Sequence, residues 1–506
     1  MAHVRVTLAS LATVVVAVGG FPVVFAQQPG PGKGPNLPQR TGPYVEVAGF
    51  RSAGGVTKAD AAKAKAAFEV FAKYHADYVT HPLTHTAPQD FRVEPPPTNP
   101  NTPLTVDQLI AELYRNLIVP SPVPVQNPVA APGQGAIATA TARDTEMIAK
   151  ESEYIRGLGA ALDKALGEIV SKSNEQVVKI NAARMLAAAC RSGAQDHWPT
   201  VTKLLTDANV PPEIRYYALH AAGNLLAAYD INDYRSRKHA ADPKTVGALV
   251  AALQNAVLKA DAVVPLLDVP DGKGGVRKVV PPDQVPVLQF IRRQAVRSLG
   301  QVRFAEYETE KGKMLYPAHT LALVALNKVP VETFQVSGEK IEFGPAPKNA
   351  VGDAADAGEA VLGILNMAPP RGGAAAKQYA APMADVIATG VITWVGPRSS
   401  NPASKEQAWK GMALRLDEGL KTWQGLFDVN WDPVKPVIRP ELVPQSAKDV
   451  AKAVTEYVIE PLGSTTRPVN LTGLQTTQRD VLRRVQGITP RPFIAPDSPA
   501  LPVQYQ

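Results

Sequence analysis

The sequence predicts an all-α protein, built from stacked helical hairpins with proline-rich segments at both ends. Aromatic residues make up 6% of the chain although 45% is hydrophobic, and an alanine-rich, aromatic-poor core favours close-packed helices over sheets. Apolar residues recur at helical spacing through the middle of the chain. A ten-residue helical pattern also occurs there three times, which is typical of a repeat architecture.

The first element, residues 1–26, is predicted to be a signal peptide. Arg5 precedes an apolar run over 6–26 that ends in VFA, with small residues where a signal peptidase reads. About 20 apolar residues are also enough for an uncleaved anchor, but two glycines and a proline near the end favour cleavage. We therefore expect a periplasmic or extracellular bacterial protein with no transmembrane span after cleavage. Membrane anchoring by this segment is the alternative.

Composition divides the remaining chain into four parts. Residues 27–56 are rich in Pro and Gly and predict a disordered linker. A small helical region with Pro-rich loops is expected over 57–140. The helical repeat domain is expected over 141–430, followed by a Pro-rich C-terminal segment, 431–506, with one or two short helices.

Two helices are predicted in the region 57–140. The first follows Thr57, which forms a capping-box pattern with Asp60. The second runs over 105–118, with a capping box formed by Thr105 and Gln108 and a stop before a proline.

In the repeat domain, a long helix is predicted from Ala142 to about Ser171. Residues 261–283, rich in Pro, Gly and charge, predict an inserted loop. Alternation over 331–345 predicts a β-hairpin. The other predicted helices are 175–191, 198–208, 211–229, 243–260, 285–303, 315–328, 353–367, 375–395, 403–425, 446–459 and one near 475–486.

The repeated pattern aligns without gaps in VKINAARMLA (178–187), IRYYALHAAG (214–223) and IRRQAVRSLG (291–300). Each segment has an aliphatic residue followed by a cation, an alanine four residues after the aliphatic, and a tiny residue at its end. The first two segments begin 36 residues apart, and the next gap of 77 leaves room for the 261–283 insertion. The positions are Val178, Lys179, Ala182, Ile214, Arg215, Ala218, Gly223, Ile291, Arg292, Ala295 and Gly300.

These three segments resemble HEAT repeats, in particular the bacterial HEAT-like type with a VRxxAxxALG helix. The resemblance is clear over 175–303 and extends over 142–425 with decayed copies. It implies an α-solenoid with an interaction surface on the second helix of each hairpin, and it implies no catalytic residues. The cation after the aliphatic residue is expected to bond an acid or a carbonyl of the adjacent repeat rather than a ligand.

Few residues suggest catalytic or metal chemistry. Cys190 is the single cysteine, which excludes an intrachain disulfide and a multi-cysteine zinc site, and its alanine-rich helix predicts a small core residue. His75, His81 and His85 are weak candidates for metal ligands, but Pro82 interrupts the helix that would align two of them. The glycines at 157 and 159 lie in a helical pattern, not after a strand, so a dinucleotide site is not indicated. No cofactor is expected.

Charge and tryptophan placement bear on possible ligands. The chain carries a net charge of +7, but its densest basic groups, 233–239 and 290–297, form no stripe of the kind that nucleic acid requires. Tryptophans in the C-terminal third predict core filling, with an aromatic platform for a glycan or peptide as the alternative. These are Trp394, Trp409, Trp423 and Trp431.

The sequence therefore favours a non-catalytic interaction or scaffold protein of the cell envelope, with an unidentified protein partner. One alternative is an envelope enzyme with a metal site near His75, His81 and His85. The other is a cell-wall or polysaccharide-binding module that uses the C-terminal tryptophans.

Overall fold

The structure is a computed structural model of the 506-residue chain. The predicted signal peptide and His85 lie outside the residues that it describes. The described residues are 37–82, 104–117, 142–228, 243–271, 273–305, 307–308, 314–337, 340–347, 349–369, 373–399, 407–427, 443–464 and 468–485.

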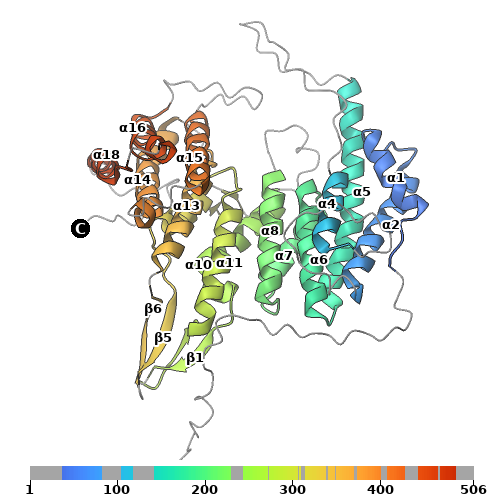
Figure 1. Ribbon diagram of the computed structural model, residues 1–506, viewed down its shortest axis with the longest axis horizontal. Coiled ribbons are helices and arrows are strands. Elements are labelled where there is room, and N and C mark those ends of the chain that lie inside the picture. The colour runs from blue at the N-terminus through green and yellow to red at the C-terminus, as the bar shows by residue number, and fades with distance from the viewer. Residues whose placement is uncertain are drawn as a thin grey trace, which may run out of the picture.

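Two rows of helices form the centre of the molecule (Figure 1). Helices of each row pack on their row neighbours, and in the first four pairs across the rows each first-row helix packs on the next described α-helix of the chain. The predicted all-α class is confirmed. The first row holds α5 (Ala142–Lys172), α7 (His197–Thr206), α10 (Pro243–Leu258), α12 (Pro317–Ala325) and α14 (Gly373–Ser399). The second row holds α6 (Gln176–Ala189), α8 (Pro212–Ala228), α11 (Val285–Leu299), α13 (Ala350–Leu365) and α15 (Gln407–Gly425).

Prolines and acids mark where several of these helices begin. Helix α8 starts at Pro212, and Glu213 lies in its first turn. Proline is tolerated there because its missing N–H would have no partner inside the helix, and the carboxylate interacts favourably with the positive helix end. Helix α13 is capped differently, because the Asn349 side chain accepts a hydrogen bond from the Gly352 N–H. The local sequence thus sets the corners between the helices.

Small residues let the second-row helices approach closely. A Cβ added to Gly223 of α8 would lie 2.9 Å from the Ser298 Oγ and 3.3 Å from its Cα on α11. One added to Gly300, at the end of α11, would lie 2.8 Å from the Cα of Gly363 on α13. The Ser298 hydroxyl also donates to the Leu219 carbonyl at 2.6 Å. Backbone proximity and this buried hydrogen bond together hold α8, α11 and α13 in line.

The glycines at 157 and 159 have a packing role. A Cβ on Gly157 would lie 2.8 Å from the Phe68 ring, and one on Gly159 would collide with the Cβ of Ala194. Both glycines therefore allow neighbouring segments to touch the backbone of α5. This contact explains the Gly-Leu-Gly sequence without any nucleotide.

Three helices cover the N-terminal end of the rows: α1 (Gly42–Ser52), α2 (Ala61–Thr80) and α4 (Val106–Leu117). Helix α2 packs on α5, α4 packs on α6, and α1 packs on α2. The predicted capping box of α4 is present, since Thr105 N donates to Gln108 Oε1 at 2.9 Å and Gln108 N donates to Thr105 Oγ1 at 3.2 Å. The prediction of a disordered linker over 27–56 is wrong for α1, because Tyr44 and Val47 are buried in the core.

The C-terminal helices pack against the last helices of the rows. They are α16 (Gln445–Val454), a π-helical turn η5 (Thr455–Ile459), α17 (Glu460–Gly463) and α18 (Leu471–Val485). Gln478 of α18 donates to Asp385 Oδ1 at 3.0 Å and to Thr389 Oγ1 at 2.6 Å, which fixes α18 on α14. Helices predicted over 446–459 and near 475–486 are thus found. Within the described residues, no helix is long and apolar enough to cross a membrane.

In the part of the chain that the structure describes, short strands form three antiparallel hairpins. The predicted hairpin near 331–345 is confirmed, but the prediction of a loop over 261–283 is wrong, since it contains a hairpin. Its turn is held by Asp271, whose Oδ1 accepts from the N–H groups of Lys273 and Gly275, both at 2.8 Å. The strands are β1 (Leu267–Pro270) with β2 (Val276–Val279), β3 (Tyr307–Glu308) with β4 (Met314–Leu315), and β5 (Glu332–Ser337) with β6 (Lys340–Pro345). Short 3-10 turns lie at Cys190–Ser192, Ala260–Ala262 and Pro282–Gln284.

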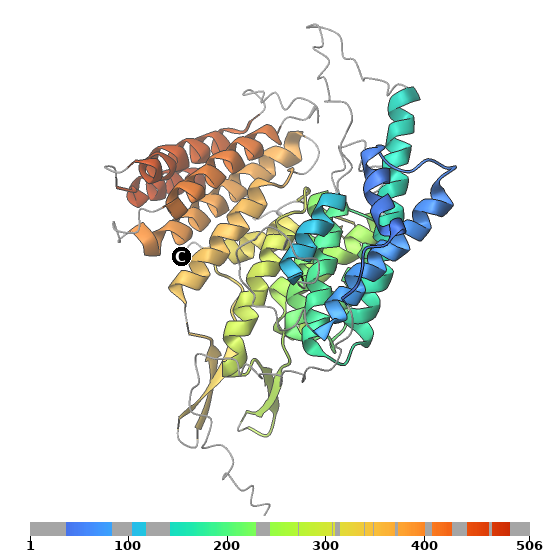
Figure 2. The same cartoon turned by 45° about the vertical axis from the view of Figure 1, so that its right-hand side comes forward.

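The β1–β2 and β5–β6 hairpins extend from the helices side by side, as Figure 2 shows. Val280 N donates to the Glu332 carbonyl at 3.1 Å, and the Thr333 hydroxyl donates to the Val280 carbonyl at 2.8 Å. The Arg277 guanidinium also lies 5.0 Å from the centre of the Phe343 ring. The 261–283 insertion is therefore paired with the second hairpin.

The close approach at Gly223 gives a stability prediction. Replacement of Gly223 by Ala should lower the free energy of unfolding by about 1–3 kcal/mol, because the new methyl group overpacks the contact with Ser298. Gly411 of α15 is the matched control, since nothing lies within 4 Å of the position that a methyl group would take there. Gly411→Ala should raise stability by up to about 1 kcal/mol. Equal effects of the two substitutions in urea unfolding would contradict the close contact.

Candidate functional site

His75 lies in the core of the N-terminal helices. Its ring is fully buried among the rings of Tyr44, Phe71 and Tyr74, and its Nδ1 lies 2.9 Å from the Phe71 carbonyl oxygen. Burial lowers the pKa of the His75 imidazole, so the neutral form is favoured. These contacts make His75 a structural residue of α2.

The other predicted metal ligands do not join it. His81 directly follows α2 and is buried, whereas His85 lies outside the described residues. Among the residues that the structure describes, no group of three His, Cys, Asp or Glu side chains is placed to hold a metal ion. Nearby, Glu112 instead accepts from Arg40 at 2.7 Å and from the Tyr44 hydroxyl, which ties α4 to the segment around α1.

A second polar cluster, which the sequence did not reveal, joins α5 to α7. The Nδ1 of His197 lies 3.1 Å from Asp163 Oδ1, and the Thr200 hydroxyl donates to Asp163 Oδ2 at 2.8 Å. Burial and the nearby Asp163 carboxylate raise the pKa of the Cys190 thiol well above its usual value. Although Cys, His and Asp gather here, His197 and Cys190 are fully buried and the thiol stays protonated. The cluster therefore links helices and has no access to a substrate.

Tryptophan burial removes part of the predicted aromatic platform. Trp394 and Trp423 are both buried in the helical core. The side chains of Trp409 and Trp431 lie outside the described part of the structure. The predicted core filling is found for the first two, and the alternative of a glycan or peptide platform does not apply to them, because a ring enclosed by helices offers no face to a ligand.

The repeated cations bond to backbone carbonyls. Arg215 Nη1 donates to the Val263 carbonyl at 2.6 Å and its Nη2 donates to the Asp207 carbonyl at 2.9 Å. Arg292 Nη1 donates to the Val329 carbonyl at 3.2 Å. Both arginines are buried, and burial lowers the pKa of each guanidinium, which stays charged. Lys179 differs, since it is only half-buried and bonds to no residue in the described ranges.

The aligned apolar positions of α6, α8 and α11 share one property, which is burial. The alanines Ala182, Ala218 and Ala295 are buried. So are the aliphatic residues Val178, Ile214 and Ile291. Each therefore faces the core.

Aromatic side chains gather on the outer side of α8 and α11. We call Tyr216, Tyr217, His220 and Phe290 the aromatic face. Phe290 is 56% exposed, and its ring stacks on that of Tyr216 with centroids 4.8 Å apart. His220 meets Tyr216 edge-on, also at 4.8 Å. Isolated exposed apolar residues are ordinary, but a stacked group on neighbouring helices marks a surface that can bind a partner.

Arginines border this face. Arg297 of α11 and Arg415 of α15 share the single carboxylate of Glu359, at 3.0 and 3.1 Å. The two arginine side chains are 48% and 53% exposed, so this arginine edge presents a net positive charge to solvent. Phe290 and Arg297 are seven residues, or about two turns, apart on α11, so the edge adjoins the aromatic face. Burial and then the charge of Arg297 lower the pKa of His220.

The basic group 290–297 is thus partly neutralised inside the protein. Arg292 bonds a carbonyl, and Arg293 donates to Asp356 at 2.5 Å. Arg297 alone among these three keeps a half-exposed guanidinium. The other basic group, 233–239, lies outside the described residues.

Helix α4 shows how a helix binds on this side of the second row. Arg184 of α6 donates to Asp107 of α4 at 2.5 Å, and the Arg191 guanidinium lies 4.4 Å from the centre of the Tyr114 ring. In the three aligned segments, Arg184 occupies the position that His220 and Arg297 occupy in α8 and α11. The seventh position of the aligned segments could be read from the sequence. That it faces a surface on which a helix packs follows only from the contact between Arg184 and α4 in the structure.

Comparison with known proteins adds no relative: no protein-family model, curated protein or solved structure matches the chain. Function is therefore inferred from the residues described above.

Two histidines, the buried His75 and the half-buried His220, predict that the stability of the protein depends on pH. Burial lowers the pKa of His75 and of His220, so the unfolded chain, with histidine pKa values of about 6.5, binds their protons more tightly. The free energy of unfolding should therefore fall as the pH drops below about 6.5. The His75→Phe variant should lose less stability than the wild type between neutral and mildly acidic pH.

Melting temperatures across this pH range check the prediction, with His220→Gln as a second variant that removes the other histidine. At His75, Glu112 favours the protonated form and Arg40 opposes it, but desolvation is the largest effect. Parallel pH profiles for the wild type and both variants would contradict it.

Proposed function

We propose that this chain is a non-catalytic protein-interaction module, a HEAT-like α-solenoid exported to the cell envelope. The hairpin order, the buried cation–carbonyl bonds of Arg215 and Arg292, and the small residues between second-row helices support the solenoid. The aromatic face and its arginine edge support the interaction role.

The exposed stack of Phe290 on Tyr216 is the observation that carries the proposal. Residues that dominate binding energy at protein interfaces are enriched in aromatics and arginine and cluster together. Here an exposed aromatic stack between α8 and α11 lies on the same helix as the half-exposed Arg297, which shares Glu359 of α13 with the half-exposed Arg415 of α15. A partner that covers Phe290 would remove a large apolar surface from water.

We propose an acidic amphipathic helix as the occupant. Two arginines that share one carboxylate leave positive charge at the edge, which an acidic residue complements. The chain itself supplies the precedent, because α4 is amphipathic, buries Leu109 and Leu113, and pairs Asp107 with Arg184. The partner helix would place its apolar side on the aromatic face and an acid beside Arg297.

Export is supported by the signal-like first 26 residues, in which Arg5 precedes an apolar run that ends in small residues. Cleavage after Ala26 should give a mature chain that begins at Gln27. N-terminal sequencing of the protein from its native envelope fraction checks this. An intact N-terminus in the membrane fraction would support the anchor instead.

The interaction role gives a binding prediction. Replacement of Phe290 by Ala should weaken partner binding about tenfold or more, because an exposed aromatic anchor is lost. Stability should change by less than about 0.5 kcal/mol. Leu414→Ala is the matched control, since Leu414 is 57% exposed on α15 and lies outside the aromatic face. It should leave binding unchanged.

The measurement begins with cross-linked capture from envelope extract, using mature wild-type, Phe290→Ala and Leu414→Ala protein side by side. Proteins lost from the Phe290→Ala sample alone are partner candidates. A synthetic peptide of the candidate's acidic amphipathic segment is then titrated by fluorescence anisotropy, with Arg297→Glu as a charge-reversed variant. Equal capture by all three proteins, or peptide affinity that is insensitive to Arg297→Glu, would contradict the proposal.

A further inference from the structure

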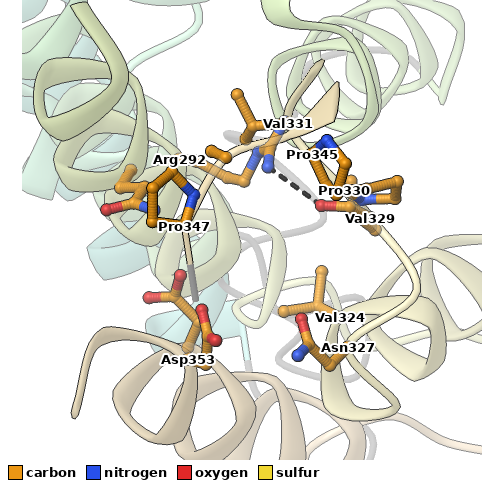
Figure 3. A pocket seen from close by; sticks show the side chains of 12 residues that line it. Arg292, Val324, Asn327, Val329, Pro330, Val331, Pro345, Pro347 and Asp353 are labelled. Carbon is orange, nitrogen blue, oxygen red and sulfur yellow. Dashed lines mark hydrogen bonds between the residues drawn. The ribbon is translucent and has the colours of Figure 1, made fainter. Parts of the chain in front are cut away.

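A cavity of about 150 Å³ lies where α11 and α13 meet the chain segments that leave α12 and β6 (Figure 3). Polar and charged side chains from three elements reach it, including Arg292 of α11, Asn327 after α12, and Asp353 and Asp356 of α13. Valines and the prolines Pro330 and Pro345 form its apolar walls. The cavity is separate from the aromatic face.

Arg292 has fewer partners than the matching arginine of the previous repeat. Both Nη atoms of Arg215 donate to carbonyls, whereas Arg292 uses Nη1 alone. Arg292 is 6% exposed, its Nε is buried without a partner, and its Nη2 bonds to none of the described residues. The Nε of Arg215 is also unpaired, so the difference lies at Nη2 and in the cavity that Arg292 borders. The Nε of Arg292 is a charged, buried donor without an acceptor, which is costly, and Arg292 borders a cavity that an acceptor could enter.

A carboxylate without a partner lies across the cavity. Asp353 is half-buried and forms no ion pair or hydrogen bond through its side chain with the described residues. Asp356 differs, because it pairs with Arg293 at 2.5 Å. Figure 3 shows Arg292 on one side of the cavity and Asp353 and Asn327 on the other. The cavity therefore offers an unfilled cationic donor and an unfilled anionic acceptor to one occupant.

We infer that this cavity binds a small zwitterion of the free amino-acid class, with its carboxylate on Arg292 and its ammonium on Asp353. A plain anion would meet two aspartates, and a plain cation would meet Arg292, so a ligand that carries both charges fits best. A cavity of this volume holds about six non-hydrogen atoms, the size of benzene. The valine and proline walls suit a short apolar side chain.

The inference stands apart from the proposed protein partner, because the ligand-contacting residues differ from the aromatic face. Pro330 and Pro345 restrict the two segments that form the walls, since proline fixes its own backbone angle. The site is therefore largely formed before a ligand binds.

The experiment measures binding of L-alanine to the mature chain by calorimetry and by the shift in melting temperature. Propionate lacks the ammonium of alanine and ethylamine lacks its carboxylate, so each probes one half of the site. We expect L-alanine, which has six non-hydrogen atoms, to bind, and propionate and ethylamine to bind at least about tenfold more weakly.

Variants assign the binding to the cavity. Asp353→Asn should weaken L-alanine binding at least about tenfold with little change in the melting temperature of the ligand-free protein, because Asp353 has no partner to lose among the described residues. Asp283→Asn is the matched control, since Asp283 is an exposed carboxylate just before α11. It should leave L-alanine affinity unchanged.

Three results would overturn the inference. They are no binding of L-alanine at about 10 mM, equal binding of propionate or ethylamine, and an unchanged affinity in Asp353→Asn. Equal binding of propionate would identify a simple anion site on Arg292. None of these results bears on capture of a protein partner through Phe290, so the two proposals fail independently.

Discussion

Close contact between second-row helices is the constraint on which the rest of the structure depends. Gly223 lies against Ser298, and Gly300 lies against Gly363, so a methyl group at either glycine would collide with the next helix. The Ser298 hydroxyl then reaches the Leu219 carbonyl. Because these backbones lie so close, the side chains that point outward from α8 and α11 stand next to each other. That spacing brings Tyr216 and Phe290 into a stack.

A buried arginine follows the aliphatic residue in two of the three aligned segments, and its hydrogen bonds also shape the structure. A guanidinium can satisfy several carbonyls at once, and it stays charged when buried because its intrinsic pKa is very high. Arg215 bonds the chain on both sides of its hairpin, to Asp207 and Val263. At Arg292 the second carbonyl is replaced by a cavity with acidic residues opposite. Arg215 thus links two segments through carbonyl hydrogen bonds, whereas Arg292 links one segment and borders the cavity proposed as a ligand site.

Helix α11 connects the two proposed sites. Phe290 and Arg297 lie on its outer side, whereas Arg292 points into the protein toward α13. Arg293 joins α11 to α13 through Asp356 and the Gly352 carbonyl. A ligand in the cavity would therefore touch the same pair of helices that carries the arginine edge. By contrast, the histidines and tryptophans that suggested other chemistries are, where described, enclosed in the core.

The sequence by itself determined the helix positions and the repeated pattern, because helical periodicity, prolines and caps act over a few residues. It also singled out three aligned cations, of which Arg215 and Arg292 bond carbonyls and Lys179 bonds to no residue in the described ranges. The helix α1, the β1–β2 hairpin and the Asp163–His197 pair were decided by tertiary contacts, since each depends on a partner distant in the chain. The same holds for the functional surfaces. Tyr216 and Phe290 are 74 residues apart in the sequence, the parts of the cavity are likewise distant from one another, and only the stacking of helices brings them together.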